Sequence, residues 1–230
     1  MKNLCIIPAR GGSKRIPRKN IKPFMGKPIM AYSIEASCDS GIFDEVMVST
    51  DDLEFAEVAR QYGASVPFLR SQATSNDYAT TADVINEVLE QYKAQGTEFD
   101  VVCCLYSTAP FVTPDRLNEA FDKLSDKTDG CFTMVQYSYP VQRSLRINER
   151  GFVEMTHPEH YRSRSQDLEP IYHDAGQFYF IKVAAFLKEK TLWCERTMPL
   201  ILSELEVQDL DTEVDWGLAE MKFELLKKQN

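Results

Sequence analysis

The chain has 230 residues, of which 43% are hydrophobic and 27% are charged, and its formal net charge is −9. This length and composition are typical of one globular domain with a single substantial core. The acidic balance argues against broad electrostatic binding to nucleic acid or to an anionic membrane. The apolar run at the N-terminus is interrupted by Pro8 and Arg10 and is too short for a signal sequence or a membrane span, so we expect a cytoplasmic protein.

Apolar runs alternate with helical patterns up to about residue 136, which is the signature of β-α-β units. The expected strands are LCIIPA, EVMVST, SVPFLR, DVVCCLYST and GCFTMVQY, and the expected helices are PIMAYSIEAS, DLEFAEVARQYG, residues 80–93 and a segment that opens at Thr113 and Pro114. This order predicts an α/β fold, with a doubly wound, mostly parallel sheet covered by helices on both faces. Ligands of such sheets bind beyond the carboxyl ends of the strands, where three loops should meet: PARGGSKRIPRKN, STDD and YSTAPF.

The periodicity weakens over residues 138–170, where arginines and two histidines stand among turn residues. We therefore expect a single domain over residues 1–230 that includes an excursion over residues 138–170. The excursion should carry function or a subunit contact, and we expect a homodimer in which it crosses to the neighbouring chain. The run GQFYFIKV then resumes a strand, and residues 211–228 form an amphipathic helix.

A basic loop directly follows the first expected strand. Residues 10–34 contain seven basic residues and no acidic one, which predicts a local pocket for a small polyanion. Gly11 and Gly12 would let backbone N–H groups approach a phosphate, and Arg10, Lys14 and Arg15 would add charge-assisted hydrogen bonds. The loop matches neither the dinucleotide fingerprint nor the P-loop, which argues against an NAD-dependent oxidoreductase. A solvated basic surface loop is the alternative interpretation.

Two aspartates near the other end of the chain, Asp209 and Asp211, are separated by one residue. In an extended segment this spacing puts both carboxylates on one face, which suits a hard divalent cation such as Mg²⁺. The alternative is that Asp211 caps the last helix while Asp209 is merely solvated. An acidic pair combined with a polyphosphate loop favours an enzyme over a non-catalytic nucleotide-binding regulator.

The run IPARGGSKRIPRKN resembles the signature of the CMP-sugar synthetases, and the similarity extends over essentially the whole chain. The resemblance implies a sheet of the nucleotide-diphospho-sugar transferase type and transfer of CMP from CTP to the anomeric hydroxyl of a sugar acid. It also implies that Arg10 and Lys14 hold the CTP phosphates and that Arg70 and Thr81 bind cytosine. The alternative interpretation is that Arg70 only ends a strand and that Thr81 only caps a helix. The nucleotide-binding candidates are Ala9, Arg10, Gly11, Gly12, Ser13, Lys14, Asn20, Arg70 and Thr81. The alternative enzyme is a nucleotidyltransferase that uses a sugar phosphate. Selectivity for CTP over UTP would distinguish the two enzymes.

The ending D-x-D-T-x-x-D-W resembles the sialic-acid branch of that family, in which the D-x-D binds Mg²⁺, so Asp209 and Asp211 become candidate catalytic metal ligands. Two segments depart from the sialic pattern: YSTAP replaces the usual QPTSP, and YHDAGQFY replaces the usual Asn-Gly-Ala run. The run YHDAGQFY resembles the pseudaminic acid cytidylyltransferases of flagellin and capsule glycosylation, which implies pseudaminate as the nine-carbon acceptor, with N-acetylneuraminate and legionaminate as alternatives. The acceptor-binding candidates are Tyr106, Thr108, His173 and Gln177. Arginines of the excursion, among them Arg143, Arg146, Arg162 and Arg164, are available to neutralise the sugar carboxylate.

Overall fold

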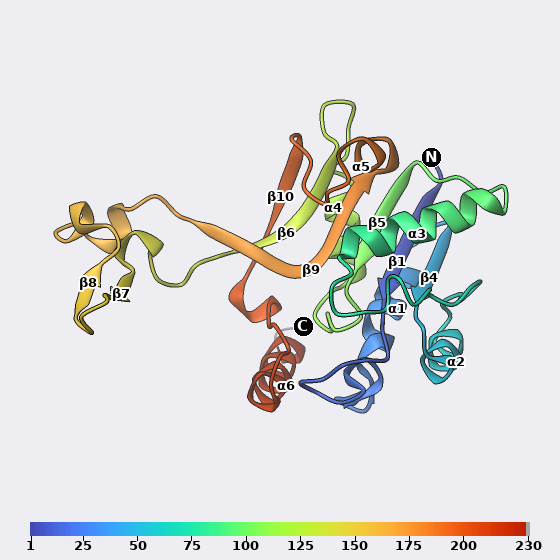
Figure 1. Ribbon diagram of the computed structural model, residues 1–230, viewed down its shortest axis with the longest axis horizontal. Coiled ribbons are helices and arrows are strands. Elements are labelled where there is room, and N and C mark those ends of the chain that lie inside the picture. The colour runs from blue at the N-terminus through green and yellow to red at the C-terminus, as the bar shows by residue number, and fades with distance from the viewer. Residues whose placement is uncertain (229–230) are drawn as a thin grey trace.

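A computed structural model describes residues 1–228 and shows, within them, a six-stranded central sheet with helices on both faces (Figure 1). The strands are β1 (Asn3–Pro8), β4 (Glu45–Ser49), β5 (Val101–Leu105), β6 (Gly130–Gln136), β9 (Tyr172–Lys182) and β10 (Thr197–Leu202). Their order across the sheet is β10-β6-β9-β5-β1-β4. β9 runs antiparallel to both of its neighbours, while the other paired strands are parallel. The mostly parallel sheet predicted from the sequence is thus confirmed.

Two apolar layers enclose the sheet. Helices α1 (Ile29–Ser40), α2 (Leu53–Gln61) and α4 (Pro114–Phe121) pack on one face, and α3 (Thr81–Ala94) and α5 (Val183–Glu189) pack on the other. Alternate residues of β5 divide between the layers, since Cys103 belongs to the first and Cys104 to the second. The last helix, α6 (Glu213–Lys227), packs on a separate aromatic cluster beside the loop that follows β1. Within residues 1–228 no helix is long and apolar enough to cross a membrane.

One expected strand is absent from the sheet, and one strand of the sheet was not expected. The run SVPFLR makes only an isolated bridge between Ser65 and Met47, because Pro67 has no N–H with which to continue a ladder. The strand β10 was not expected, since its run TMPLIL contains Pro199. β10 lies at the edge of the sheet, where a missing N–H is tolerated. Smaller elements include the hairpin of β2 (Pro23–Phe24) and β3 (Lys27–Pro28) and the short helix η1 (Lys19–Ile21).

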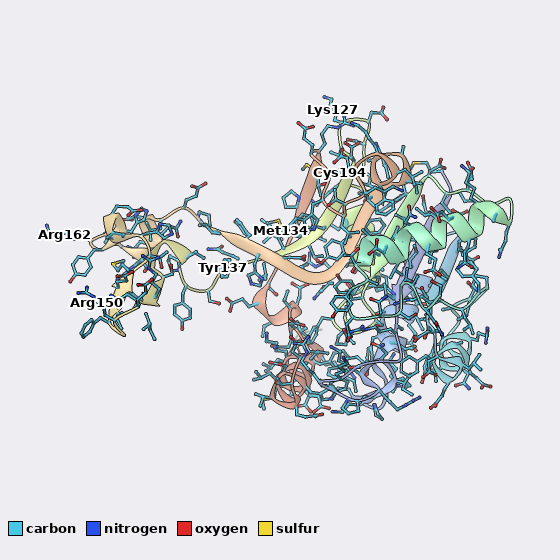
Figure 2. All side chains as sticks on the ribbon, in the orientation of Figure 1. Lys127, Met134, Tyr137, Arg150, Arg162 and Cys194 are labelled. Carbon is cyan, nitrogen blue, oxygen red and sulfur yellow. The ribbon has the colours of Figure 1, made fainter. Side chains whose placement is uncertain are left out.

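Residues 137–171 form an extension that projects away from the body of the molecule (Figure 1). It contains a hairpin of β7 (Leu145–Ile147) and β8 (Val153–Met155) with the short helices η2 (Val141–Arg143), η3 (Pro158–His160) and η4 (Ser165–Asp167). Figure 2 shows Arg150 and Arg162 at its far end. No residue from 136 to 174 is buried. The extension matches the expected excursion to within one residue at each end, and it has no core of its own.

Candidate active site

A pocket of about 660 Å³ lies at the carboxyl ends of β1 and β5, beside the start of α3. Three segments far apart in the sequence form it: the loop after β1, residues 70–84 and the start of the loop after β5. Eight of the predicted site residues line it: Arg10, Ser13, Lys14, Asn20, Arg70, Thr81, Tyr106 and Thr108. The pocket therefore occupies the edge of the sheet at which doubly wound proteins bind their ligands.

The three other predicted nucleotide-binding residues, at positions 9, 11 and 12, are not on the pocket wall. Ala9 is fully buried and its N–H donates to the last carbonyl of β4 at 2.9 Å, so this N–H is already occupied, and the nucleotide contact of Ala9 stays a prediction. The Gly11 N–H donates to Asp51 Oδ1 at 2.9 Å, and a Cβ at Gly11 would lie 3.2 Å from Asp52 Oδ2. A side chain at Gly11 would therefore press on the Asp52 carboxylate. Gly12 is exposed and faces open space.

Buried contacts hold the basic loop in one shape. Ile16 is fully buried in the aromatic cluster that supports α6, and Ser13 Oγ donates to the Ile16 carbonyl at 2.6 Å. Asn20 is also buried, and its Nδ2 donates to the Arg10 carbonyl at 3.0 Å. Asn20 Oδ1 lies 2.9 Å from Ser107 Oγ in the loop after β5. Ser13 and Asn20 therefore stabilise the loop, and Asn20 also joins it to the neighbouring strand end.

Two basic side chains of this loop converge on one carboxylate. Arg10 Nη1 lies 2.9 Å from Asp77 Oδ1, and Lys14 Nζ lies 2.5 Å from Asp77 Oδ2. Hydrogen bonds from Lys14 and then Arg10 lower the pKa of the Asp77 carboxyl. A carboxylate bridging two cations occupies the kind of position in which phosphate oxygens are held, because both anions accept charge-assisted hydrogen bonds.

Arg70 lies at the inner end of the pocket. Its Nη2 donates to the Ser49 carbonyl at 2.7 Å, and its Nε donates to Ser49 Oγ at 3.1 Å. Burial lowers the pKa of Arg70, but a guanidinium remains protonated in proteins. Within the described residues its Nη1 makes no hydrogen bond, so this nitrogen can donate to a ligand oxygen.

Thr81 is the first residue of α3, and its hydroxyl faces the pocket. Its Oγ1 lies 3.3 Å from the hydroxyl of Tyr106. The preceding residue, Thr80, caps the helix through a capping box with Asp83. The interpretation of Thr81 as a helix cap is therefore wrong, and its hydroxyl is not occupied by the helix terminus.

The two ends of the chain meet at the rim of the pocket. Leu210 is buried in the same cluster as the basic loop, which brings the flanking Asp209 and Asp211 beside that loop. Asp211 forms an ion pair with Arg15, and Lys19 Nζ donates to the Leu210 carbonyl at 2.6 Å. Burial lowers the pKa of Lys19, and Asp211 and then Asp209 oppose this shift. Both carboxylates therefore lie close to a cation of the pocket wall.

Asp211 does not cap the last helix. Thr212 and Asp215 form the capping box of α6, with the Asp215 carboxylate accepting from the Thr212 N–H at 2.7 Å. No three His, Cys, Asp or Glu side chains in residues 1–228 are grouped as a complete metal site. Asp209 and Asp211 nevertheless fit Mg²⁺, since this ion commonly takes one or two carboxylates and completes its shell with water and substrate phosphates.

A second cavity of about 420 Å³ adjoins the first. It shares three residues with the first cavity: Thr80, Thr81 and Tyr106. Its other lining residues are Ala82, Asp174, Tyr179, Lys190, Thr191, Leu192 and Trp193. Leu192 and Trp193 make one side apolar, whereas Asp174 and Tyr179 make another side polar. The cavity can therefore hold an amphipathic molecule directly beside the occupant of the first.

The predicted acceptor residues of β9 lie elsewhere, because the strand is irregular at Gly176. This glycine has φ 62°, and the register of β9 against β6 shifts nearby. Asp174 faces the second cavity, while His173 borders a separate small pocket with Asp209. Gln177 is 5% exposed and its Nε2 donates to a backbone carbonyl in the segment before Asp209. The amide of Gln177 therefore holds that segment, and its contact with the acceptor stays a prediction.

Sequence reasoning missed Tyr179, Leu192 and Trp193 as cavity residues. The glycine inside the YHDAGQFY run was the available signal for β9, because an isolated glycine in a strand often marks a bulge that redirects side chains. For Leu192 and Trp193 the sequence contained no comparable signal, since they lie in an irregular turn between α5 and β10.

A doubly wound sheet with a basic pocket and an acidic pair at its carboxyl edge is the arrangement of a nucleotidyltransferase. The chain matches the family model described as "Cytidylyltransferase" over residues 4–222, and it therefore belongs to the cytidylyltransferase family. The protein is thus an enzyme of the class predicted from its basic loop.

Individual relatives agree with the family. The chain is 46% identical to the pseudaminic acid cytidylyltransferase of Campylobacter jejuni, with 98% of this chain and 97% of the relative covered. It is 36% identical to the CMP-N,N'-diacetyllegionaminic acid synthase of Legionella pneumophila, with the same two coverages. A CMP:2-keto-3-deoxy-manno-octonic acid synthetase solved with CTP has a TM-score of 0.70, covers 99% of this chain and 100% of its own, and is 17% identical. This last likeness confirms the expected fold type.

Proposed function

We propose that this cytidylyltransferase transfers CMP from CTP to the anomeric hydroxyl of a nonulosonic acid, with pseudaminate as the acceptor, and releases pyrophosphate. The observation that carries the proposal is the pair of adjoining cavities that share Thr80, Thr81 and Tyr106. The first is basic and suits a nucleoside triphosphate, and the second is amphipathic and suits a sugar acid. The 46% identity to a pseudaminic acid cytidylyltransferase supports the choice of acceptor.

In this proposal the triphosphate of CTP displaces Asp77 from Arg10 and Lys14. The cytosine ring lies at the inner end of the first cavity, where Arg70 Nη1 donates to its O2 or N3 and the Thr81 hydroxyl is within reach. The anomeric oxygen then attacks the α-phosphate in line with the departing pyrophosphate. Because both substrates are anionic, the cationic loop contributes most by stabilising charge and holding the reacting atoms in place.

We assign Mg²⁺ to Asp209 and Asp211. Their position beside Lys19 and Arg15 supports this assignment, because the rim of the pocket is where the phosphates would complete the coordination. When bound, the ion would supply electrostatic stabilisation of the phosphate oxygens. Arg15 would be released from Asp211 at that point and could bind a phosphate oxygen.

We further propose a homodimer in which the extension over residues 137–171 reaches the partner chain. Six of its apolar side chains are between 63% and 86% exposed: Tyr139, Leu145, Ile147, Phe152, Val153 and Tyr161. An apolar surface of this kind favours association with another protein surface. Arg146 and Arg164 are paired with Glu154 and Asp167, respectively. Arg143 and Arg162 have no carboxylate partner among the described residues, so they are the candidates to neutralise the sugar carboxylate of a neighbouring site.

Pyrophosphate release from CTP and Mg²⁺ against a panel of nonulosonic acids tests the proposed function. We expect pseudaminate to be the best acceptor, N-acetylneuraminate and legionaminate to be poor ones, and UTP not to replace CTP. A higher kcat/KM for either alternative acid would reassign the acceptor, and turnover with a sugar phosphate would reject the reaction. Since CTP is an intracellular nucleotide, we place the reaction in the cytoplasm.

A further inference from the structure

Asp174 has no part in the steps described above, yet it is the one carboxylate among the residues that line the second cavity. Both of its oxygens are fixed. The Tyr179 hydroxyl donates to Oδ2 at 2.6 Å, and the Gly176 N–H donates to Oδ1 at 2.8 Å. Gly176 makes the second bond possible because its φ of 62° suits a residue without Cβ. These two hydrogen bonds therefore hold the Asp174 carboxylate in one orientation in the cavity wall.

An ionised carboxylate accepts hydrogen bonds and donates none, so Asp174 determines the direction of the Tyr179 O–H. With its proton committed to Asp174, the Tyr179 oxygen can only accept a further bond. Tyr106 packs beside Tyr179, with ring centroids 5.6 Å apart. Burial raises the pKa of both tyrosines, so their hydroxyls stay protonated at neutral pH. The Asp174–Tyr179 pair consequently presents acceptor oxygens to a ligand.

We propose that Asp174 is a specificity-determining residue that accepts an amide N–H of the acceptor, and so selects a sugar acid with an acylamino substituent at that position. This inference rests on the proposed function, in which the second cavity holds the acceptor. An acyloxy group of the same size has no proton to donate, and its oxygen lone pairs would face the Asp174 carboxylate. A half-buried charged acceptor discriminates against such an analogue, because the carboxylate is left without its partner.

Asp174 also orients the acceptor. The sugar's own carboxylate is repelled by Asp174, because like charges in a partly desolvated site interact unfavourably. The acid group is thereby directed away from the Asp174 wall, while the acylamino group is directed toward it. Leu192 and Trp193, which also line the cavity, are apolar and would accept the methyl groups of the sugar. One residue thus fixes which way round the sugar lies beside the nucleotide.

The experiment pairs a change in the protein with a matched change in the substrate. Pseudaminate and two analogues, in which each acetamido group is replaced in turn by an acetate ester, are compared by kcat/KM in the wild type and in Asp174→Asn. At one of the two positions the wild type should prefer the amide by roughly 10- to 100-fold, as expected for a hydrogen bond to a charged group. In Asp174→Asn that preference should fall below about threefold, because the carboxamide N–H₂ can donate to the ester.

Two further variants make the outcome specific. Tyr179→Phe retains the carboxylate and should retain the preference for the amide. Asp126→Asn makes the same charge change on an exposed loop and should leave every ratio and the KM for CTP unchanged. A wild type that does not distinguish amide from ester at either position overturns the inference, and so does an Asp174→Asn variant that is slower on all acids with an unchanged ratio. If the wild type uses none of the acids, the proposed function itself fails, which is a separate result.

Discussion

The nucleotide pocket and the extension over residues 137–171 differ in what fixes their side chains. In the pocket, polar side chains are tied to backbone atoms of the same chain, as Asn20 is to Arg10 and Arg70 is to Ser49. In the extension no residue is buried, and the apolar side chains lie at the surface of a single chain. One chain therefore preorganises the binding of CTP by itself, whereas the extension gains burial only from another surface. Mutations in the two regions should therefore affect different kinetic constants.

The largest effect should come from the acidic pair. Asp209→Asn and Asp211→Asn should each reduce Mg²⁺-dependent kcat by about 10³-fold or more, because loss of a hard ligand removes charge stabilisation worth several kcal/mol of barrier. Initial rates over a Mg²⁺ titration measure this, and the unfolding transition should be close to that of the wild type. Near wild-type kcat in both variants would refute the metal assignment.

Substitutions in the basic loop should reduce catalysis by a smaller amount. Arg10→Ala and Lys14→Ala should each weaken catalysis by about 2–4 kcal/mol, because each removes a charge-assisted phosphate contact from a preorganised loop. Steady-state kinetics with CTP as the varied substrate measure the effect. Lys127→Ala, an equal loss of charge on an exposed loop, is the control. Unchanged CTP kinetics in both loop variants would make the loop a solvated surface segment.

The extension should act on the acceptor and not on CTP. Arg162→Ala should raise the KM for the sugar acid about 10- to 100-fold, since it removes a charged hydrogen bond to the substrate carboxylate. Arg146→Ala is the matched control, because Arg146 is already paired with Glu154. Mixing Arg162→Ala with Asp211→Asn should restore part of the activity, as one site of each mixed dimer would be intact. A monomer by light scattering at the assay concentration would rule out the shared site.

The smallest effect concerns the carboxylate that competes with the phosphates. Asp77→Asn should lower the KM for CTP by up to about fivefold, because the triphosphate no longer displaces an exposed ion pair with Arg10 and Lys14. Equilibrium binding of CTP without acceptor isolates this change from the chemical step. Weaker binding in the variant would mean that Asp77 positions the two cations instead of competing for them.

Much of the pocket could be predicted because it depends on local order. The basic loop follows a buried strand directly, and parallel strands place their carboxyl ends at one edge, so Arg10, Lys14 and Thr108 could be assigned to one site. The predictions failed where a single residue changes the backbone geometry of a strand. Gly176 makes β9 irregular, and Asp174, for which no role was expected, faces the second cavity while His173 borders another pocket. The hydrogen bond of the Ala9 N–H could not be predicted, because it depends on pairing with a distant strand.

The packing of Leu210 against the basic loop has a consequence for biosynthesis. Lys19 and the Leu210 carbonyl that it binds are separated by 191 positions, and the ion pair of Arg15 with Asp211 spans a similar distance. At ribosomal rates of about 5–20 residues per second, roughly 10–40 s pass between synthesis of these two segments. During that interval the nascent loop carries its positive charges without their C-terminal partners. The rim of the pocket is thus completed only after residues 209–211 have been synthesised, and a chain truncated before Asp209 lacks both carboxylates.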